Sequence, residues 1–167
     1  MSPSPPPATA QTAYLALGSN LGDRRARIES ALARLAAVPG NRLVAASSLY
    51  ANPAVGLPGA PEFLNAAARI ETRLEPEALL DLCLRIEEEL GRVRTGRTES
   101  RPIDLDVLIY AGVTRAGPRL VLPHPRMRER AFVLLPLAEI APDEMLQGRT
   151  VADWAARLPA SGIRKLA

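Results

Sequence analysis

The chain has 167 residues, of which 47% are hydrophobic and 23% charged, values ordinary for a globular protein with one sizeable core. No run of 18 apolar residues occurs, so the sequence predicts no membrane span. The start, MSPSPPPATAQ, lacks the basic and apolar regions of a secretory signal, and we expect residues 1–12 to form a disordered Pro-rich tail and residues 13–167 a single domain. The one cysteine, Cys83, cannot form an internal disulfide and favours a cytoplasmic location.

The formal net charge is +3, and every basic residue except Lys165 is an arginine. Genome base composition accounts for that preference, but the placement is more informative. The arginines crowd two predicted loops, with Arg92, Arg94, Arg97 and Arg101 in the first and Arg126, Arg128 and Arg130 in the second. Guanidinium groups suit phosphate oxygens, so the two clusters suggest an anionic ligand, although either alone would be an ordinary solvated surface.

Apolar periodicity and the Gly/Pro breakers predict the elements in chain order. They are a strand over 13–18, a helix over 24–37, a strand over 42–50, a loop over 51–61, a strand over 62–71, a helix over 76–90, the Arg-rich loop, a strand within 101–110, a turn over 111–118, a short strand over 119–122, and a turn leading into a short helix. Asp23 offers an N-cap, Pro76 opens the second long helix and Gly91 ends it. Residues 150–157 are compatible with a further helix.

This order of strands and helices is the split βαβ pattern. It predicts an α+β fold, a ferredoxin-like sandwich with a mainly antiparallel sheet and a C-terminal extension. We expect the helices on one face of the sheet and the other face available for binding.

The stretch RPIDLDVLIY, residues 101–110, alternates as a half-buried strand does. One face carries Ile103, Leu105, Val107 and Ile109, and the other carries Asp104, Asp106, Leu108 and Tyr110. Two aspartates on one strand face lie about 6–7 Å apart and repel each other. A solvated face with arginine partners would explain an ordinary pair. Here Mg²⁺ is the competing explanation, because it prefers oxygen ligands and commonly combines one or two carboxylates with substrate phosphates.

Carboxylates for a metal and arginines for a polyphosphate together indicate phosphoryl-transfer chemistry, which depends on positioning and charge neutralisation. No Walker motif occurs, which excludes a P-loop enzyme.

Taken in order, several motifs resemble the 6-hydroxymethyl-7,8-dihydropterin pyrophosphokinase family of folate biosynthesis. They are YLALGSNLGD (14–23), SSLYANPAVG (47–56), FLNAA (63–67), IEEELGRVR (86–94), RPIDLDVLIY (101–110) and LPHPRMRERAFVLLPLAEIAPD (122–143). The resemblance implies the same sandwich fold and an enzyme that transfers the pyrophosphoryl group of ATP to the hydroxymethyl oxygen of the pterin, releasing AMP.

The resemblance also implies roles for individual residues. Asp104 and Asp106 match the acids that hold two Mg²⁺ ions, and Arg92 and Arg101 match the arginines that grip phosphates during transfer. The implied ATP-binding residues are Glu87, Arg94, His124 and Arg130. The implied pterin-binding residues are Gly18, Val55, Phe63, Asn65 and Phe132.

The types of these residues are suited to binding a pterin. A flat pterin can stack on scarce rings such as Phe63 and Phe132, and the Asn65 amide can pair with donors and acceptors on its edge. Taken singly, either Phe would more often be a core residue and His124 a turn or core residue. Relatives commonly carry a Trp and a GPR step in the loop before the acids, where this chain has TGRTESR, and an aromatic after the His, where it has Pro125.

Two other readings compete. A ferredoxin-like nucleic-acid binder would suit a pI near 9.6, but it needs aromatics in an RRM-like motif that the sequence lacks. A regulatory small-molecule module would leave the acids and arginines unexplained. We therefore expect ATP and the pterin as ligands, no nucleic-acid or membrane partner, and a monomer.

Overall fold

A computed structural model describes residues 9–54, 57–93 and 100–166. Its elements are β1 (Gln11–Ser19), α1 (Arg24–Ala37), β2 (Arg42–Ala46), β3 (Tyr50–Asn52), β4 (Phe63–Thr72), α2 (Pro76–Glu89), β5 (Asp104–Tyr110), β6 (Arg115–Ala116), β7 (Val121–Leu122), the 3₁₀ turn η1 (Met127–Glu129), α3 (Ala131–Ile140), β8 (Met145–Leu146), β9 (Arg149–Thr150), α4 (Val151–Ala156) and β10 (Arg164–Lys165). Within these ranges no helix is both long and apolar enough to cross a membrane.

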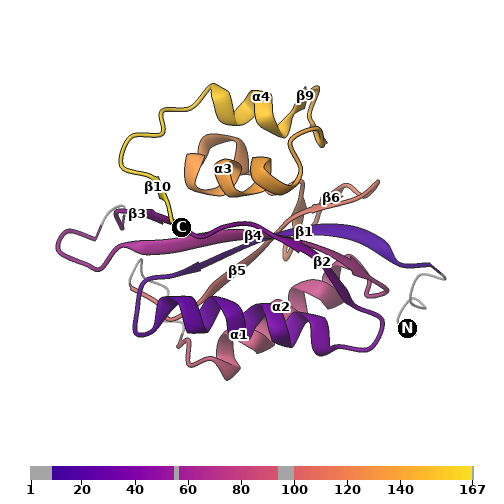
Figure 1. Cartoon of the computed structure of the whole chain (residues 1–167). Helices are drawn as coiled ribbons and strands as arrows, with labels where there is room; N and C mark the ends of the chain where they lie inside the picture. Colours follow the sequence, from indigo (N-terminus) through magenta and orange to yellow (C-terminus); the bar gives the residue numbers. More distant parts are fainter. Residues whose placement is uncertain (1–8, 55–56, 94–99, 167) are drawn as a thin grey trace.

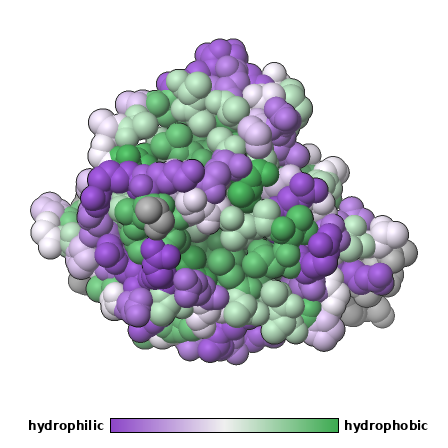
Figure 2. Space-filling view, in the orientation of Figure 1, coloured by the Kyte–Doolittle hydropathy of each residue, from purple (hydrophilic) through white to green (hydrophobic). Residues whose placement is uncertain are grey.

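The main sheet has the order β10-β3-β4-β1-β5, and β2 also pairs with β4. Its recorded pairings are antiparallel. Helices α1 and α2 cover one face, while α3 and α4 lie over the other (Figure 1). Seen from the same side, apolar side chains gather between these two helical layers and are bordered by hydrophilic ones (Figure 2). The α+β sandwich expected from the sequence is confirmed.

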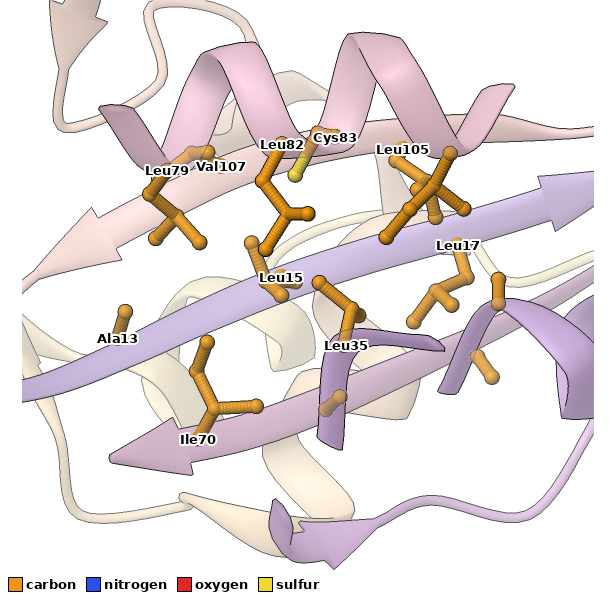
Figure 3. Packing of buried hydrophobic residues seen from close by; sticks show 14 of the residues in the cluster. Ala13, Leu15, Leu17, Leu35, Ile70, Leu79, Leu82, Cys83, Leu105 and Val107 are labelled. Atoms are coloured by element: carbon orange, nitrogen blue, oxygen red, sulfur yellow. The ribbon is translucent and has the colours of Figure 1, made fainter. Parts of the chain in front are cut away.

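The larger core lies between the sheet and the layer of α1 and α2. Leu79, Leu82 and Cys83 of α2 point at the sheet, where they meet Leu15 and Val107 (Figure 3). The spacing of these α2 residues places them on one helical face, so a single amphipathic stripe is buried. A fully buried Leu contributes about 1.5–3 kcal/mol to stability.

A second core lies on the opposite face of the sheet and corrects one expectation. Helix α3 is apolar, and its Val133, Leu134 and Leu137 are buried with Leu108 and Met127. The expectation of a second face left open for binding is therefore wrong in part, since α3 and α4 cover much of it. What remains open is a cavity beside α3.

The predicted strand over 42–50 is two strands, and the predicted loop over 51–61 begins later than expected. Strands β2 and β3 pair with opposite ends of β4, at Ala68–Glu71 and at Phe63–Asn65. Between them the Ser47 N–H donates to the Ala67 carbonyl, and the Ser47 hydroxyl accepts from the Ala67 N–H, both at 2.8 Å. A side chain thus replaces part of the backbone ladder, which periodicity cannot reveal.

A bulge in β5 reverses the predicted faces of its last two residues. Tyr14 pairs with Ile109 and Leu15 with Val107, so Leu108 is the extra residue. Tyr110 therefore packs in the core under α1 and α2, whereas Ile109 packs on the α3 side. The Tyr110 hydroxyl donates to the Leu74 carbonyl at 2.7 Å.

The predicted helix ends are confirmed. The Asp23 side chain accepts from the Ala26 N–H at 3.0 Å, which caps α1. Pro76 is the first residue of α2, and Gly91 follows the helix with φ +99°. At one edge of the sheet, β10 pairs with β3 and brings Arg164 and Lys165 beside Ala51 and Tyr50.

Candidate functional site

A cavity of about 490 Å³ lies between the sheet and the η1–α3 segment. Its walls come from β1, β3, β4 and β5, from the segment before β5, and from η1 with its flanking residues and α3. Residues predicted from four separate motifs line it together: Gly18, Phe63, Asn65, Arg101, Asp104, Asp106, Arg130 and Phe132. Antiparallel pairing explains the convergence, because Gly18 on β1 lies opposite both Asn65 of β4 and Asp104 of β5.

The two aspartates have different surroundings. Asp104 accepts from Arg92 Nη1 at 2.7 Å, and its other oxygen lies 3.6 Å from Arg101 Nε. Burial, the Asp104 charge and the Glu87 charge raise the pKa of Asp106 to about 7, against the opposing effect of nearby arginines. Asp106 is thus a carboxylate that would be stabilised by an added cation.

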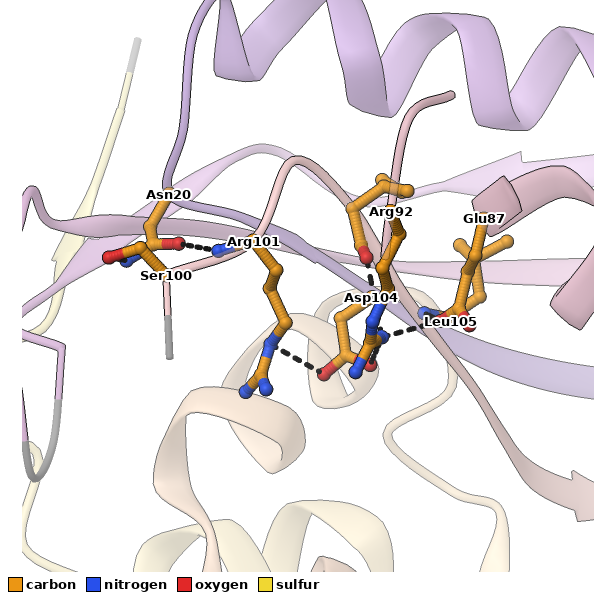
Figure 4. A network of polar contacts seen from close by, with 8 residues as sticks. Asn20, Glu87, Arg92, Ser100, Arg101, Asp104 and Leu105 are labelled. Atoms are coloured by element: carbon orange, nitrogen blue, oxygen red, sulfur yellow. Dashed lines mark hydrogen bonds and ion pairs between the residues drawn. The ribbon is translucent and has the colours of Figure 1, made fainter. Parts of the chain in front are cut away.

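Arg92 joins the pocket to the buried side of β5 (Figure 4). Its Nη1 donates to Glu87 at 2.9 Å as well as to Asp104, and the Glu87 carboxylate also accepts from the Leu105 N–H at 2.7 Å. Burial lowers the pKa of Arg92, but Asp104 and the other acids outweigh it and leave the pKa raised. Glu87 is 1% exposed and is not part of the cavity wall, so the structure places it behind Arg92.

Asn20 directly follows β1. It is fully buried, and its Nδ2 donates to the Pro61 carbonyl at 3.3 Å and the Ser100 hydroxyl at 3.0 Å. Its Oδ1 accepts from the Arg101 N–H at 2.7 Å (Figure 4). One amide therefore ties the end of β1 to the ends of the two loops that border the cavity. No local pattern in GSNLGD could have indicated contacts so distant in sequence.

Phe63 and Phe132 also line the cavity, and each has an arginine near its ring. The guanidinium carbon of Arg101 lies 5.4 Å from the Phe63 centroid, and that of Arg130 lies 5.8 Å from the Phe132 centroid. Phe63 belongs to neither core, whereas Phe132 lines the cavity and also packs against the second core.

The carboxamide of Asn65 is held by a second residue that the sequence did not single out. Asn65 Nδ2 donates to Asn52 Oδ1, and Asn52 Nδ2 donates in turn to the Pro53 carbonyl at 3.0 Å. Asn52 lies on the cavity wall and was assigned to a loop. Gly18 lies beside this carboxamide and leaves space for it, because a Cβ there would lie 3.0 Å from Asn65 Oδ1 and 3.7 Å from Phe63 Cδ1.

His124 lies in the turn before η1. Its backbone N–H donates to the Leu108 carbonyl at 2.8 Å, and its Nδ1 accepts from the Arg126 N–H at 3.2 Å. Burial and then the Arg130 charge lower its pKa, Asp104 opposes them, and Arg126 adds a smaller lowering effect. The imidazole is therefore neutral at pH 7, and because Nδ1 accepts a hydrogen bond, its proton is on Nε2. His124 does not line the cavity, whereas Arg126 of the second arginine cluster and Glu129 do, although the family resemblance assigned neither of them a role. The predicted residues Val55 and Arg94 lie outside the described residues.

One cavity on this sheet contains paired carboxylates, guanidinium groups and aromatic rings. This combination is typical of a phosphoryl-transfer enzyme whose acceptor substrate is flat. The model of the 7,8-dihydro-6-hydroxymethylpterin-pyrophosphokinase family matches residues 14–142, and the chain belongs to this family. The resemblance noted in the sequence is confirmed.

Relatives and solved structures agree. The chain is 53% identical over 154 residues to the 2-amino-4-hydroxy-6-hydroxymethyldihydropteridine pyrophosphokinase of Methylorubrum extorquens, covering 92% of this chain and 98% of that protein. It is 44% identical over 157 residues to the enzyme of the same name from Pseudomonas aeruginosa, covering 93% and 97%. A crystal structure of wild-type Plasmodium falciparum HPPK-DHPS with pteroate shares the fold, with a TM-score of 0.71 and 15% identity over 94% of this chain and 43% of that one. Enzymes of this family transfer a pyrophosphoryl group from ATP to hydroxymethyldihydropterin in folate synthesis.

Proposed function

We propose that the cavity beside α3 is where this chain transfers the pyrophosphoryl group of ATP to the hydroxymethyl oxygen of 6-hydroxymethyl-7,8-dihydropterin, releasing AMP. The observation that carries the proposal is that a single cavity joins Asp104 and Asp106 to Phe63 and Phe132. Donor and acceptor chemistry therefore have adjoining places, as a direct transfer between two bound substrates requires.

The carboxylate pair fits a hard divalent cation, and we propose two Mg²⁺ ions. Within residues 9–54, 57–93 and 100–166 no group of three or more His, Cys, Asp or Glu side chains could hold an ion. Asp104 and Asp106 would thus supply the protein ligands, and phosphate oxygens and water the others, which is the usual composition of a magnesium site at a nucleotide. Bound there, the ions supply neutralisation of phosphate charge and alignment of the reacting oxygens.

The arginines perform the remaining charge compensation. Without nucleotide, Arg92 and Arg101 have Asp104 as their partner. Incoming phosphates offer both guanidinium groups a stronger bidentate acceptor, so they can grip the transferred group without leaving a buried charge unpaired. Arg130 contacts the phosphates from the side of η1, and His124 and Arg94 are assigned to the ATP phosphates by the family resemblance. Glu87 contributes to nucleotide binding through Arg92, which it holds.

The pterin stacks between Phe63 and Phe132, and its edge pairs with the amide of Asn65. Gly18 leaves room for that amide, and Val55 is assigned to the same pocket by the family resemblance. In relatives a Trp of the loop before the acids is common, and TGRTESR offers no ring there.

An AMP-release assay with ATP, MgCl₂ and 6-hydroxymethyl-7,8-dihydropterin tests the proposal. AMP and the pterin diphosphate should form in equal amounts, and neither should form without the pterin or with excess EDTA. ADP as the product, or turnover unaffected by EDTA, would contradict the mechanism. Replacing the pterin by a plain alcohol controls for hydrolysis.

We also propose that the enzyme works as a cytoplasmic monomer without nucleic-acid or membrane partners. The support is that both substrates are small molecules. Sedimentation equilibrium in the presence of both substrates tests the oligomeric state. A dimer whose dissociation abolished turnover would contradict the proposal.

A further inference from the structure

The three arginines of the second cluster diverge in the structure, although they are close in sequence. Arg126 and Arg130 line the cavity beside α3. Arg128 turns away, and its guanidinium carbon lies 5.3 Å from the centroid of the Trp154 ring on α4. The cluster is therefore not a uniform basic surface, since only two of its members can meet a ligand in the cavity.

The turn that carries Arg126 is held firmly against the strand of the carboxylates. Met127 is fully buried, and the His124 N–H is bonded to Leu108 of β5. The Arg126 N–H is bonded to His124 Nδ1 at 3.2 Å. The Arg126 backbone thus has a fixed position relative to Asp106, which precedes Leu108 on the same strand.

Depth in the cavity separates Arg126 from Arg130. Arg130 is partly buried and stacks on Phe132, whereas Arg126 is exposed at the mouth. The transferred phosphates must lie deep, beside Asp104 and Asp106 and close to the pterin. The phosphate that remains on AMP, and the nucleoside attached to it, would then lie near the opening of the cavity. On the side of η1, the guanidinium groups that line the cavity are those of Arg126 and Arg130.

We propose that Arg126 is a further substrate-binding residue and contacts the phosphate that remains on AMP. The family resemblance gave it no role. This inference rests on the proposed function, since it takes ATP as the ligand. A guanidinium at this place would hold both ATP and the product AMP, and it would contribute little to the binding of adenosine.

The test compares Arg126→Ala with Arg128→Ala. Both remove one positive charge from the same short segment, but Arg128 faces Trp154. Calorimetry should show that Arg126→Ala weakens binding of α,β-methylene-ATP and of AMP by a similar factor of about tenfold, and leaves adenosine and pterin binding unchanged. Arg128→Ala should bind all four ligands like the wild type. Arg126→Lys should fall between Arg126→Ala and the wild type, because it keeps the charge and loses the fork.

The outcomes separate the two proposals. Equal binding by Arg126→Ala and Arg128→Ala, or a loss for the ATP analogue without a loss for AMP, overturns the assignment of Arg126. An equal loss for adenosine overturns it in favour of a contact with the base. A wild-type protein that binds neither nucleotide and releases no AMP refutes the proposed function itself. Circular dichroism melting of each variant excludes misfolding as the cause.

Discussion

Asp104 and Asp106 are two positions apart on β5, yet their surroundings give them different effects on stability. Asp104 is paired with Arg92, whose side chain is only 13% exposed. Asp106 lies among negative neighbours in a buried position. Replacement of each by its neutral amide should therefore change stability in opposite directions while both replacements stop catalysis.

We expect Asp106→Asn to raise the free energy of unfolding by an amount on the order of 1 kcal/mol, because a buried like-charge contact is removed. Asp104→Asn should lower it by an amount on the order of 1–3 kcal/mol, because Arg92 loses a charged partner. AMP release should be nearly abolished in both. Urea unfolding at neutral pH measures the stabilities. Destabilisation of equal size in the two variants would show that their surroundings are alike.

Gly18 is a position where the absence of a side chain is needed for space. Its φ is not in the left-handed region, so alanine strains no backbone there, but the added Cβ meets Asn65 at 3.0 Å. Gly18→Ala should raise the KM for the pterin several-fold and leave the KM for ATP unchanged. Gly117→Ala is the matched control, because its Cβ would meet only the Leu120 carbonyl at 3.7 Å. Equal increases in the KM values for both substrates would place Gly18 outside the pterin-binding part of the cavity.

At the scale of elements, Glu139 joins α3 to the edge of the sheet. Its carboxylate accepts from the Ser48 N–H and the Tyr50 hydroxyl, each at 2.7 Å, and lies 3.3 Å from Lys165 Nζ on β10. Burial raises its pKa, but these bonds outweigh it, so the pKa lies below the ordinary 4.5. Burial and the bond to Glu139 raise the pKa of Tyr50 to about 12.

A lowered carboxyl pKa fixes the sign of the pH dependence. The stabilisation by Glu139 is complete above pH 4.5 and is lost as pH falls through the folded-state pKa. Glu139→Gln should therefore cost about 1–2 kcal/mol at pH 7 and progressively less below pH 4.5, after allowance for partial exposure. Unfolding at several pH values measures it, and spectrophotometric titration should show a lower Tyr50 pKa. A difference independent of pH would mean that the charge has no part.

For the molecule as a whole, local rules were enough for the helices and for most strands. Asp23, Pro76 and Gly91 act within a few residues of their own position, and each marks the helix end that it predicts. The division of the strand over 42–50 and the bulge at Leu108 depend on partners in β4 and β1. No pattern along one strand contains that information.

The same division applies to the site. The sequence indicated the acids, the arginines and the rings, because their residue types are unusual for their places. Asn20 and Asn52 were missed because nothing in the sequence around them indicates a role, and the role of each comes from contacts with residues distant in sequence. The cluster of Arg126, Arg128 and Arg130 could not be divided by sequence, because the direction of each side chain is set by the turn and by Trp154.

The pairing of β10 with β3 has a consequence for how the chain folds while it is being translated. Strand β3 gains its outer neighbour only when Arg164, Lys165 and Leu166 have emerged, long after β1, β4 and α1 can assemble (Figure 1). Until then β3 presents an unpaired edge, which is a template for wrong partners. Ribosome-bound chains that end before residue 164 should bind a ribosome-associated chaperone and be cleaved near β3 by an added protease. Chains extended far enough for β10 to leave the ribosome should do neither. The last strand to be translated thus closes a sheet whose centre was laid down first.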